Sequence, residues 1–342
     1  MVAPPRLGGR GVRPTMADVA RAAGVSLKTV SRVVNEESGV RPETAALVQE
    51  AIARLGFRRN DMARALRRGQ RSRTVGLVIE DVSNPFYSAI TRGVEEVARR
   101  GGTLVIAGSS DEDADREREL VHLLCERRVE GLLIVPAGAD HRYLLPELEH
   151  GTRAVFIDRP PGLIEADVVL LDNLGGARRA VEHLLAHGHR RIALIGDEPS
   201  IFTTVERARG YRQALEAAGA RIDESLIRLG AHDAEAAART TRELLALPEP
   251  PTAVFSANNR ITVGALAALS ASGEPVALVG FDDFELAELL ALPTTVVAYD
   301  PAELGRQAAE LLSRRLAGDH GPPERVVLPT SLVARGSGEV RP

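Results

Sequence analysis

Beyond residue 73, short runs rich in β-branched residues alternate with stretches of helical periodicity for about 260 residues. Helices fit between most of these runs, for example over 86–100 and 207–218. This alternation predicts parallel sheets with helices on both faces, a fold whose ligands bind beyond the carboxyl ends of the strands. Because the strands are too many for one sheet, we predict an α/β body of two lobes with a cleft between them. The runs predicted as strands are 74–79, 103–108, 131–136, 154–158, 168–172, 191–196, 253–258, 276–283 and 294–300.

The two parts of the chain carry opposite charge. Residues 1–73 contain 15 Lys and Arg against six Asp and Glu, a net charge of +9, whereas the remainder contains 28 against 41, a net charge of −13. A basic segment favours DNA because it releases counterions from the phosphates, and an acidic body is repelled by the same polyanion. Solvated surface charge could explain single arginines but not this division. We therefore predict that the N-terminal part binds nucleic acid.

Composition excludes several classes of protein. No apolar run approaches the ~18 residues of a membrane span, and residues 1–14 contain no apolar stretch that could serve as a secretory signal. Cys125 is the only cysteine and Lys28 the only lysine. These counts exclude disulfide frameworks, multi-cysteine metal sites and mechanisms that need a lysine in the body. The nucleophile motif G-x-S-x-G and the zinc motif H-E-x-x-H are absent. We expect a cytoplasmic protein that is not an enzyme.

Three short helices are predicted in the basic segment. The first is capped by Thr15 and ends at Gly24, and the second is capped by Ser26. The third begins at Pro42 and ends at Gly56. Two short helices joined by a turn that contains glycine form a helix-turn-helix.

The start of the second helix of such a motif contacts base edges in the major groove. Leu27 can meet a thymine methyl group, and Lys28 and Arg32, one turn apart, can donate to guanine. Thr29 and Ser31 are better placed for phosphate contacts, which position the protein without reading the sequence. Lys28 and Arg32 could also be ordinary surface charge, but the chain otherwise uses arginine as its strong base.

The stretch from Thr15 to Asn60 resembles the headpiece of the LacI/GalR family of bacterial repressors. The resemblance rests on the core V-A-x-x-A-G-V-S-x-x-T-V-S-R-V-x-N, which begins at Val19. It implies a homodimer that binds near-palindromic, double-stranded operator DNA. Together with the hinge described next, the DNA contacts expected on this basis are Thr15, Ser26, Leu27, Lys28, Thr29, Ser31, Arg32, Asn60, Ala63, Leu66 and Arg68.

Residues 61–73 resemble the hinge helix and linker of the same family. Lone helices below ~12–15 residues are marginal in water. The resemblance implies that this segment orders when it pairs with its dimer mate on DNA, and that Leu66 wedges into a minor-groove step while Arg68 contacts phosphate. The alternative is a plain basic linker. Residues 1–14 are expected to be a disordered arm or a start-site artefact, because Met16 could also initiate the headpiece.

Residues 74–338 resemble the effector domain of this family, which is itself similar to periplasmic sugar-binding proteins. The family's chain crosses between the lobes three times, and we place the crossings near 159–161, 288–293 and 321–328. The predicted N-terminal lobe is thus about 74–159 and 292–320, the C-terminal lobe about 160–291 and 321–338, and the tail 339–342. The runs that carry the resemblance are 81–87, 155–160, 181–196, 207–211, 258–265 and 279–283.

Four polar residues that end or follow predicted strands match pocket positions of the family: Asp158, Arg207, Asn258 and Asp282. Carboxylates accept hydrogen bonds from vicinal hydroxyls, and arginine donates a planar fork to two acceptors. The alternative for the strand-end Asp and Asn residues is that they cap the following helix.

Phe86 and Tyr87, at the start of a predicted helix, could add a stacking wall to the pocket. The sequence departs from the family in one turn, where Asn259 replaces the usual Asp and Thr262 the usual Ala. The loss of that carboxylate puts the family's usual effector classes in doubt.

His183, His187 and His189 could suggest a metal site, because residues four apart share a helix face. We instead expect no metal, since histidine near a helix C-terminus interacts favourably with the dipole and the run matches a family pattern that carries no metal. Cys125 is expected to act as a small hydrophobic residue.

The sequence thus predicts a dimeric, operator-binding repressor that is controlled by a sugar or nucleoside-like effector and needs no cofactor and no membrane. A dimer rather than a tetramer is expected, because residues 331–342 contain no leucine heptad. A solute-binding protein of a transport system is the alternative, and a hydrolase with its site in the cleft is a second. The basic N-terminal segment argues against a solute-binding protein. A hydrolase is disfavoured because the sequence contains no recognisable nucleophile–base pair.

Overall fold

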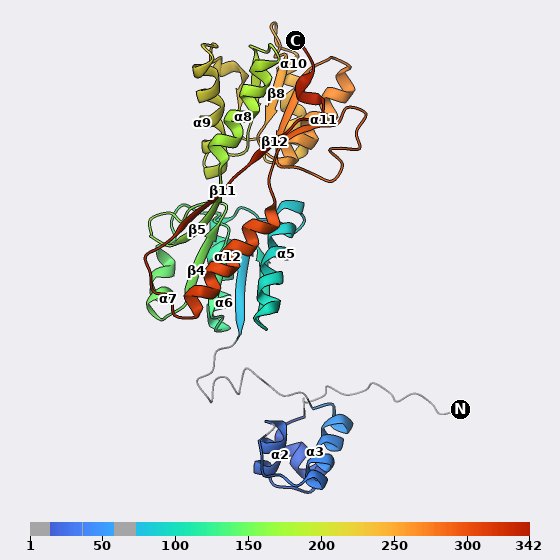
Figure 1. Cartoon of the computed structure of the whole chain (residues 1–342), viewed down its shortest axis with the longest axis vertical. Coiled ribbons are helices and arrows are strands. Elements are labelled where there is room, and N and C mark those ends of the chain that lie inside the picture. Colours follow the sequence, from blue (N-terminus) through green and yellow to red (C-terminus); the bar gives the residue numbers. More distant parts are fainter. Residues whose placement is uncertain (1–13, 36, 58–72) are drawn as a thin grey trace, which may run out of the picture. The chain divides into compact units, whose positions relative to one another are not determined.

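The computed structural model describes residues 14–35, 37–57 and 73–342, which fall into two compact units divided after Ser72. Figure 1 draws both, and each is described by itself below.

The N-terminal unit contains the three predicted helices, α1 (Met16–Ala23), α2 (Leu27–Val34) and α3 (Pro42–Leu55). A capping box begins α1, in which the Thr15 side chain accepts from the Asp18 amide and the Asp18 carboxylate accepts from the Thr15 amide. The Ser26 hydroxyl accepts from the Thr29 amide at 3.1 Å and so caps α2. These two caps, and the position of Pro42 in the first turn of α3, confirm the predicted helix starts.

Glycine ends two of these helices for a steric reason. Gly24 and Gly56 follow α1 and α3 with φ of 66° and 63°, a left-handed conformation that costs side chains with a Cβ more than it costs glycine. The turns allow one valine from each helix, Val19, Val30 and Val48, to pack together with no exposed surface. A small apolar core therefore fixes the angle between α1 and α2.

The C-terminal unit contains two six-stranded sheets, one in each lobe. Their strand orders are β11-β5-β4-β3-β1-β2 and β12-β10-β9-β8-β6-β7. Every strand pair is parallel except β10–β12, as the alternation of strands and helices predicts. The strands of the first sheet are β1 (Thr74–Ile79), β2 (Leu104–Ser109), β3 (Gly131–Ile134), β4 (Arg153–Ile157), β5 (Asp167–Leu171) and β11 (Arg325–Leu328). Those of the second are β6 (Ile192–Ile195), β7 (Ile227–Arg228), β8 (Ala253–Ser256), β9 (Ala277–Phe281), β10 (Thr295–Ala298) and β12 (Ser331–Val333).

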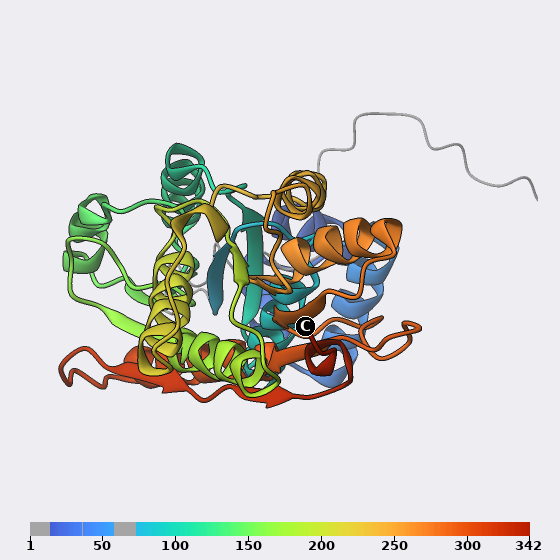
Figure 2. The same ribbon diagram turned by 90° about the horizontal axis from the view of Figure 1, so that it is seen from above.

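Helices cover both faces of each sheet (Figures 1 and 2). In the first lobe α5 and α12 pack together on one face of the sheet, and α6 packs on the other. In the second lobe α8 and α9 form one such pair, and α10 and α11 the other. The helices are α5 (Pro85–Arg100), α6 (Ala114–Glu126), α7 (Leu145–Glu149), α8 (Asn173–Ala186), α9 (Phe202–Ala217), α10 (Ala234–Leu245), α11 (Asn259–Ser272) and α12 (Pro301–Leu316).

The close contact of α5 with α12 depends on two glycines. A Cβ added at Gly93 would lie 2.0 Å from the Ala302 carbonyl oxygen, and one at Gly305 would lie 2.1 Å from that of Ile90. The backbones of the two helices therefore approach as closely as they can, which holds α12 on the first lobe although it follows a strand of the second.

Two of the three crossings between the lobes lie at other positions than predicted, and the third follows directly after the predicted range of 321–328. They occur between β5 and α8 near residue 172, between β10 and α12 near 299, and between β11 and β12 near 329. The crossings placed at 159–161 and 288–293 were wrong, because β5 pairs with β4 in the first sheet and β10 with β9 in the second. The prediction also missed the short strands β7, β11 and β12, and started α9 five residues late.

The first lobe consequently comprises about residues 74–171 and 301–328, and the second lobe the remainder of the unit. The periodicity of an apolar run shows that it is a strand but not which of two parallel sheets it joins. Among the residues described, no helix combines the length and the apolar character that crossing a membrane requires.

Candidate functional site

The first turn of α2 presents an exposed surface in the N-terminal unit. Leu27 is 53% exposed although it is apolar, and Lys28 is exposed beside it. Arg32, one turn further on, is half-buried. The Thr29 hydroxyl already has a hydrogen-bond partner, because it lies 2.9 Å from that of Ser26. An exposed leucine next to two cations at the start of the second helix fits a surface that contacts base edges.

Four of the expected DNA contacts, Asn60, Ala63, Leu66 and Arg68, lie outside the described residues, as do the hinge helix and almost all of the expected arm over 1–14. Their roles stay predictions. Thr15 and Ser26 are described, and both hydroxyls cap helices.

In the C-terminal unit a cavity of about 40 Å³ lies between the lobes. All six residues predicted to bind an effector line it: Phe86, Tyr87, Asp158, Arg207, Asn258 and Asp282. Asp158 follows β4, Asn258 follows β8 and Asp282 follows β9, so the carboxyl ends of the strands form its walls as expected. The sequence analysis missed ten further lining residues: Glu80, Asn84, Arg159, Asp197, Ile201, Thr203, Thr204, Ala257, Asn259 and Arg260.

Asp158 and Asp282 share an unusual backbone conformation. Their φ angles are 68° and 72°, in the left-handed region where Asp and Asn are the best tolerated residues after glycine. The conformation turns each carboxylate from the end of its strand into the cavity. Strained backbone of this kind clusters at functional sites.

The carboxylate of Asp158 is short of partners. It is 3% exposed, its Oδ1 atom has no hydrogen-bond partner among the described residues, and its Oδ2 lies 3.7 Å from Arg159 Nε. Burial, which disfavours the charged form, raises the pKa of this carboxyl group. A ligand hydroxyl that donates to Oδ1 would satisfy a group that the protein leaves unsatisfied.

Arg207 is fixed from several sides within the second lobe. Its Nε donates to Asn173 Oδ1 at 2.8 Å, its Nη1 to the Ala257 carbonyl at 2.5 Å, and its guanidinium stacks 3.7 Å from the centre of the Phe281 ring. Its Nη2 lies 3.7 Å from Asp282 Oδ1, which also accepts from the Tyr299 hydroxyl at 2.6 Å. The arginine and the aspartate therefore present an oriented donor and acceptor side by side.

Asn258 caps a helix and also lines the cavity. Its Oδ1 accepts from the Ile261 amide at 2.8 Å and caps α11, while its Nδ2 donates to Asp197 Oδ2 at 3.1 Å. Asp197 also lies 2.9 Å from His232 Nδ1, and this hydrogen bond raises the pKa of His232 to about 9. Asp197 follows β6, so the strand-end position that identified Asp282 could have identified it as well.

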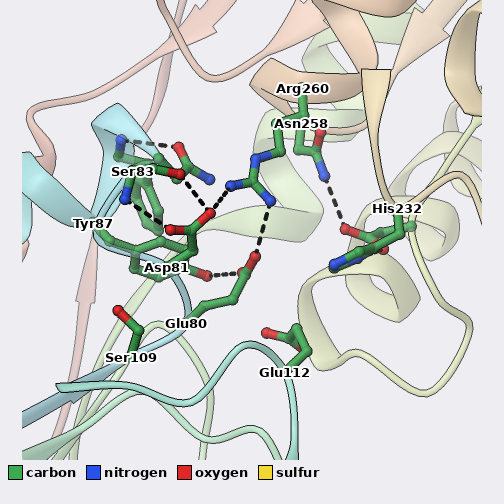
Figure 3. Close-up of polar contacts among 12 residues, drawn as sticks. Glu80, Asp81, Ser83, Tyr87, Ser109, Glu112, His232, Asn258 and Arg260 are labelled. Carbon is green, nitrogen blue, oxygen red and sulfur yellow. Dashed lines mark hydrogen bonds and ion pairs between the residues drawn. The ribbon is translucent and has the colours of Figure 1, made fainter. Parts of the chain in front are cut away.

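A second polar cluster lines the cavity from the first lobe (Figure 3). Tyr87 is buried and donates from its hydroxyl to Glu80 Oε2 at 2.6 Å, so it holds a carboxylate rather than forming an open stacking face. Arg159 donates at 2.8 Å to both Glu112 Oε2 and the Pro136 carbonyl. Burial, and then the charge of Glu112, raise the pKa of Glu80 to about 7.

Comparison with known proteins supports the same division into an N-terminal DNA-binding headpiece and a C-terminal two-lobed domain. Residues 15–60 match the bacterial regulatory proteins of the lacI family, and residues 181–338 match the periplasmic binding protein-like domain. The chain is 38% identical over 339 residues to the HTH-type transcriptional regulator CelR of Thermobifida fusca, covering 95% of this chain and 98% of that protein.

The chain belongs to the LacI family.

Two solved structures of the family cover nearly the whole chain. A transcriptional regulator CelR–cellobiose complex matches with 35% identity and a TM-score of 0.71, covering 95% of this chain and all of that one. The lac repressor dimer bound to operator and the anti-inducer ONPF matches with 27% identity and a TM-score of 0.81, covering 96% and 99%. The chain is thus a DNA-binding transcriptional regulator rather than an enzyme, and the alternative of a transport protein is not favoured.

The two departures from the usual LacI-family turn have structural explanations. Asn259 donates from Nδ2 to Asn84 Oδ1 across the cavity at 2.9 Å, a bond that an aspartate could not donate. Thr262 is fully buried, and its hydroxyl lies 2.7 Å from that of Ser256. The first departure therefore changes the cavity wall, and the second changes only the core behind it.

The three histidines considered for a metal bond to their own chain. His183 pairs with Glu339 at 2.7 Å, His187 Nδ1 lies 2.8 Å from the His183 carbonyl, and His189 Nε2 lies 2.7 Å from that of Val340. His183 and His189 hold the C-terminal residues on the second lobe. Cys125 is half-buried against the first-lobe core, and burial raises its pKa to about 11.

Proposed function

We propose that this LacI-family regulator is a repressor that binds a near-palindromic operator as a homodimer, and that an uncharged sugar in the cavity controls this binding. The observation that carries the proposal is the cavity itself, where the ends of β4 and β9 supply Asp158 and Asp282 from the two lobes and helix α9 supplies Arg207. A ligand that contacts both lobes has a different affinity for their different arrangements, and this difference is what allosteric control requires.

The charges around the cavity favour a neutral ligand. Each arginine that lines it already has a carboxylate partner: Arg159 pairs with Glu112, Arg207 with Asp282 and Arg260 with Asp81. A phosphate group would therefore meet no uncompensated positive charge. Vicinal hydroxyls, in contrast, can donate to carboxylates and accept from arginines at the same time.

A sugar fits the aromatic side chains better than a nucleoside. The ring of Phe86 packs in T-shaped arrangements with Tyr87 at 4.8 Å and Tyr299 at 6.1 Å, so it belongs to an aromatic cluster beside the cavity. A flat base needs an open ring face on which to stack. The CelR relative, whose structure contains cellobiose, gives further support for a sugar.

The test is a gel-retardation assay on an operator selected from random duplexes, with glucose, ribose, cellobiose, glucose 6-phosphate and adenosine as probes. We expect at least one neutral sugar to change operator affinity and the phosphorylated sugar to have no effect. A response to adenosine or glucose 6-phosphate alone would contradict the proposed class of effector. Failure of the full-length protein to select any duplex would contradict the function.

For DNA reading we expect Lys28→Ala and Arg32→Ala each to weaken operator binding by ~1–3 kcal/mol and to relax discrimination at one base pair per half-site, because each removes donors to a base edge. Arg21→Ala, on the exposed surface of α1, is the matched loss of one positive charge. Fluorescence anisotropy on operator and on random duplex measures both effects. Equal losses on the two duplexes for Arg32→Ala would show that it contacts only phosphate.

For assembly we expect full-length protein to have the mass of two chains in light scattering. The second lobe exposes leucines on the loop after β9, with Leu286 59% and Leu289 79% exposed, and such apolar surface is typical of contacts between copies. Leu289→Glu should therefore shift the protein toward the monomer. Leu163→Glu, at a leucine that is 67% exposed on the first lobe, is the control. If Leu289→Glu remains a dimer in light scattering, the interface between the copies lies elsewhere.

A further inference from the structure

Two consecutive residues at the start of α11 bond to the opposite lobe beside the cavity. Arg260 forms an ion pair with Asp81, and its Nη1 lies 3.5 Å from Glu80 Oε1 (Figure 3). Asn259 donates to Asn84 at 2.9 Å. Glu80 and Asp81 follow β1, and Asn84 caps α5, so the second lobe supplies the donors and the first lobe the acceptors. We call these five residues the clasp.

The clasp forms part of the cavity wall and limits its size. Glu80, Asn84, Asn259 and Arg260 all line the cavity, whose volume is about 40 Å³. A cavity of ~150 Å³ takes up a single benzene ring, so the space here is well below that of a ring-sized ligand. A sugar ring with its hydroxyls is larger. With the clasp formed, the space between the lobes is too small for the class of ligand whose chemistry it matches.

The clasp is partly shielded from water, which strengthens it. The side chains of Arg260 and Glu80 are 28% and 11% exposed. Shielded charges attract each other more strongly than fully exposed ones. Hydrogen bonds from Ser83 lower the pKa of Asp81, which keeps that carboxylate ionised as the partner of Arg260.

We propose that the clasp is autoinhibitory: it holds the lobes closed over a cavity too small for the effector, so the effector must break the Arg260 contacts to bind. This inference rests on the proposed function, because it takes the cavity as the effector site. The apparent affinity of a ligand falls in proportion to the fraction of binding-competent molecules, so Arg260 sets the effector concentration at which the regulator responds.

Hydrogen–deuterium exchange of the full-length protein tests the clasp without any ligand. We expect Arg260→Ala and Asp81→Asn each to raise amide exchange about fivefold to tenfold in 158–164 and 197–204, segments on opposite lobes that do not bond to either residue. The double variant should show no more than a single one, because both remove the same contact. Arg212→Ala, which breaks a pair with Glu224 inside the second lobe, is the matched control and should change neither segment.

Three results would overturn the proposal: faster exchange confined to residues 80–84 and 259–262, an equal effect of Arg212→Ala, or additive effects in the double variant. Asp81→Asn keeps the Oδ1 atom that accepts from the Ser83 amide at 2.8 Å, so it tests the clasp even if Arg260→Ala fails to fold. With cellobiose and glucose as probes, any sugar bound by the wild type should bind Arg260→Ala several-fold more tightly. If the gel-retardation assay shows no response to sugars, the proposed function fails while the exchange result stands.

Discussion

Asp158→Asn should shift the response of operator binding to about 10- to 100-fold higher effector concentration, while the free protein keeps its fold and its operator affinity. Its carboxylate is buried in the cavity wall, and one of its oxygens has no partner in the part of the chain that the structure describes, so we expect its main partner to be the ligand. A hydrogen bond to a charged group contributes ~1.5–3 kcal/mol, which corresponds to effector binding weaker by about 10- to 100-fold. Asparagine also tolerates the positive φ of this position.

The stability of the same variant distinguishes a binding residue from a structural one. Because burial disfavours the charged form of Asp158, the neutral amide should leave the melting temperature unchanged or raise it. Asp111→Asn is the matched control, since Asp111 has a φ of 54° on the exposed surface of the same lobe. Titration calorimetry with the sugar found by gel retardation and thermal unfolding measure the two quantities. A normal effector response in Asp158→Asn would remove this residue from the site.

Asp282 would give a less clear result than Asp158. Its Oδ1 accepts from Tyr299 and its Oδ2 accepts from the Asn259 amide at 3.3 Å. A substitution there would disturb the start of α11, and with it the clasp, as well as the ligand. The structure therefore changes which of the predicted cavity residues is the best one to test.

The three helices of the headpiece could be predicted from the sequence because their determinants are local. Thr15, Ser26 and Pro42 start helices, and Gly24 and Gly56 end them, each through backbone chemistry within one turn. For the same reason the strand-end residues Asp158 and Asp282 could be found without the structure. A polar residue after a parallel strand lies at the edge where the ligand site forms.

What the sequence could not predict depends on contacts between distant segments. Glu80 and Arg260 are 180 residues apart, and in the sequence each resembles an ordinary surface charge. Their contact becomes apparent only when the two lobes are placed together in the structure. The predicted positions of the crossings were wrong for a related reason. The strands β5 and β10 have the composition of buried strands that would suit either sheet, and only their pairing with β4 and β9 shows which sheet each one joins. The buried Tyr87 was taken for a stacking wall because its partner Glu80 was not recognised.

A buried ion pair in the first lobe fixes the segment that leads into β11. Arg315, in the last turn of α12, donates from Nε and Nη2 to the two oxygens of Asp167 at 2.8 Å each. It also donates to the carbonyls of Gly321 and Pro322, and Asp167 accepts from the Glu324 amide at 2.8 Å. These bonds attach the loop that leads into β11 to the first strand residue of β5.

Arg315→Ala should therefore destabilise the C-terminal unit by about 3–5 kcal/mol, because it leaves the buried Asp167 carboxylate without its cation. In a unit of this size that loss lowers the melting temperature by roughly 10 °C. The adjacent Arg314 is a matched control, since its side chain is 53% exposed and pairs with Glu324 and Asp319 at the surface, so Arg314→Ala should melt close to the wild type. Thermal unfolding followed by circular dichroism measures both variants. Similar shifts would mean that the Arg315 pair contributes no more than a surface contact, and the attachment of β11 would then have to come from its pairing with β5 alone.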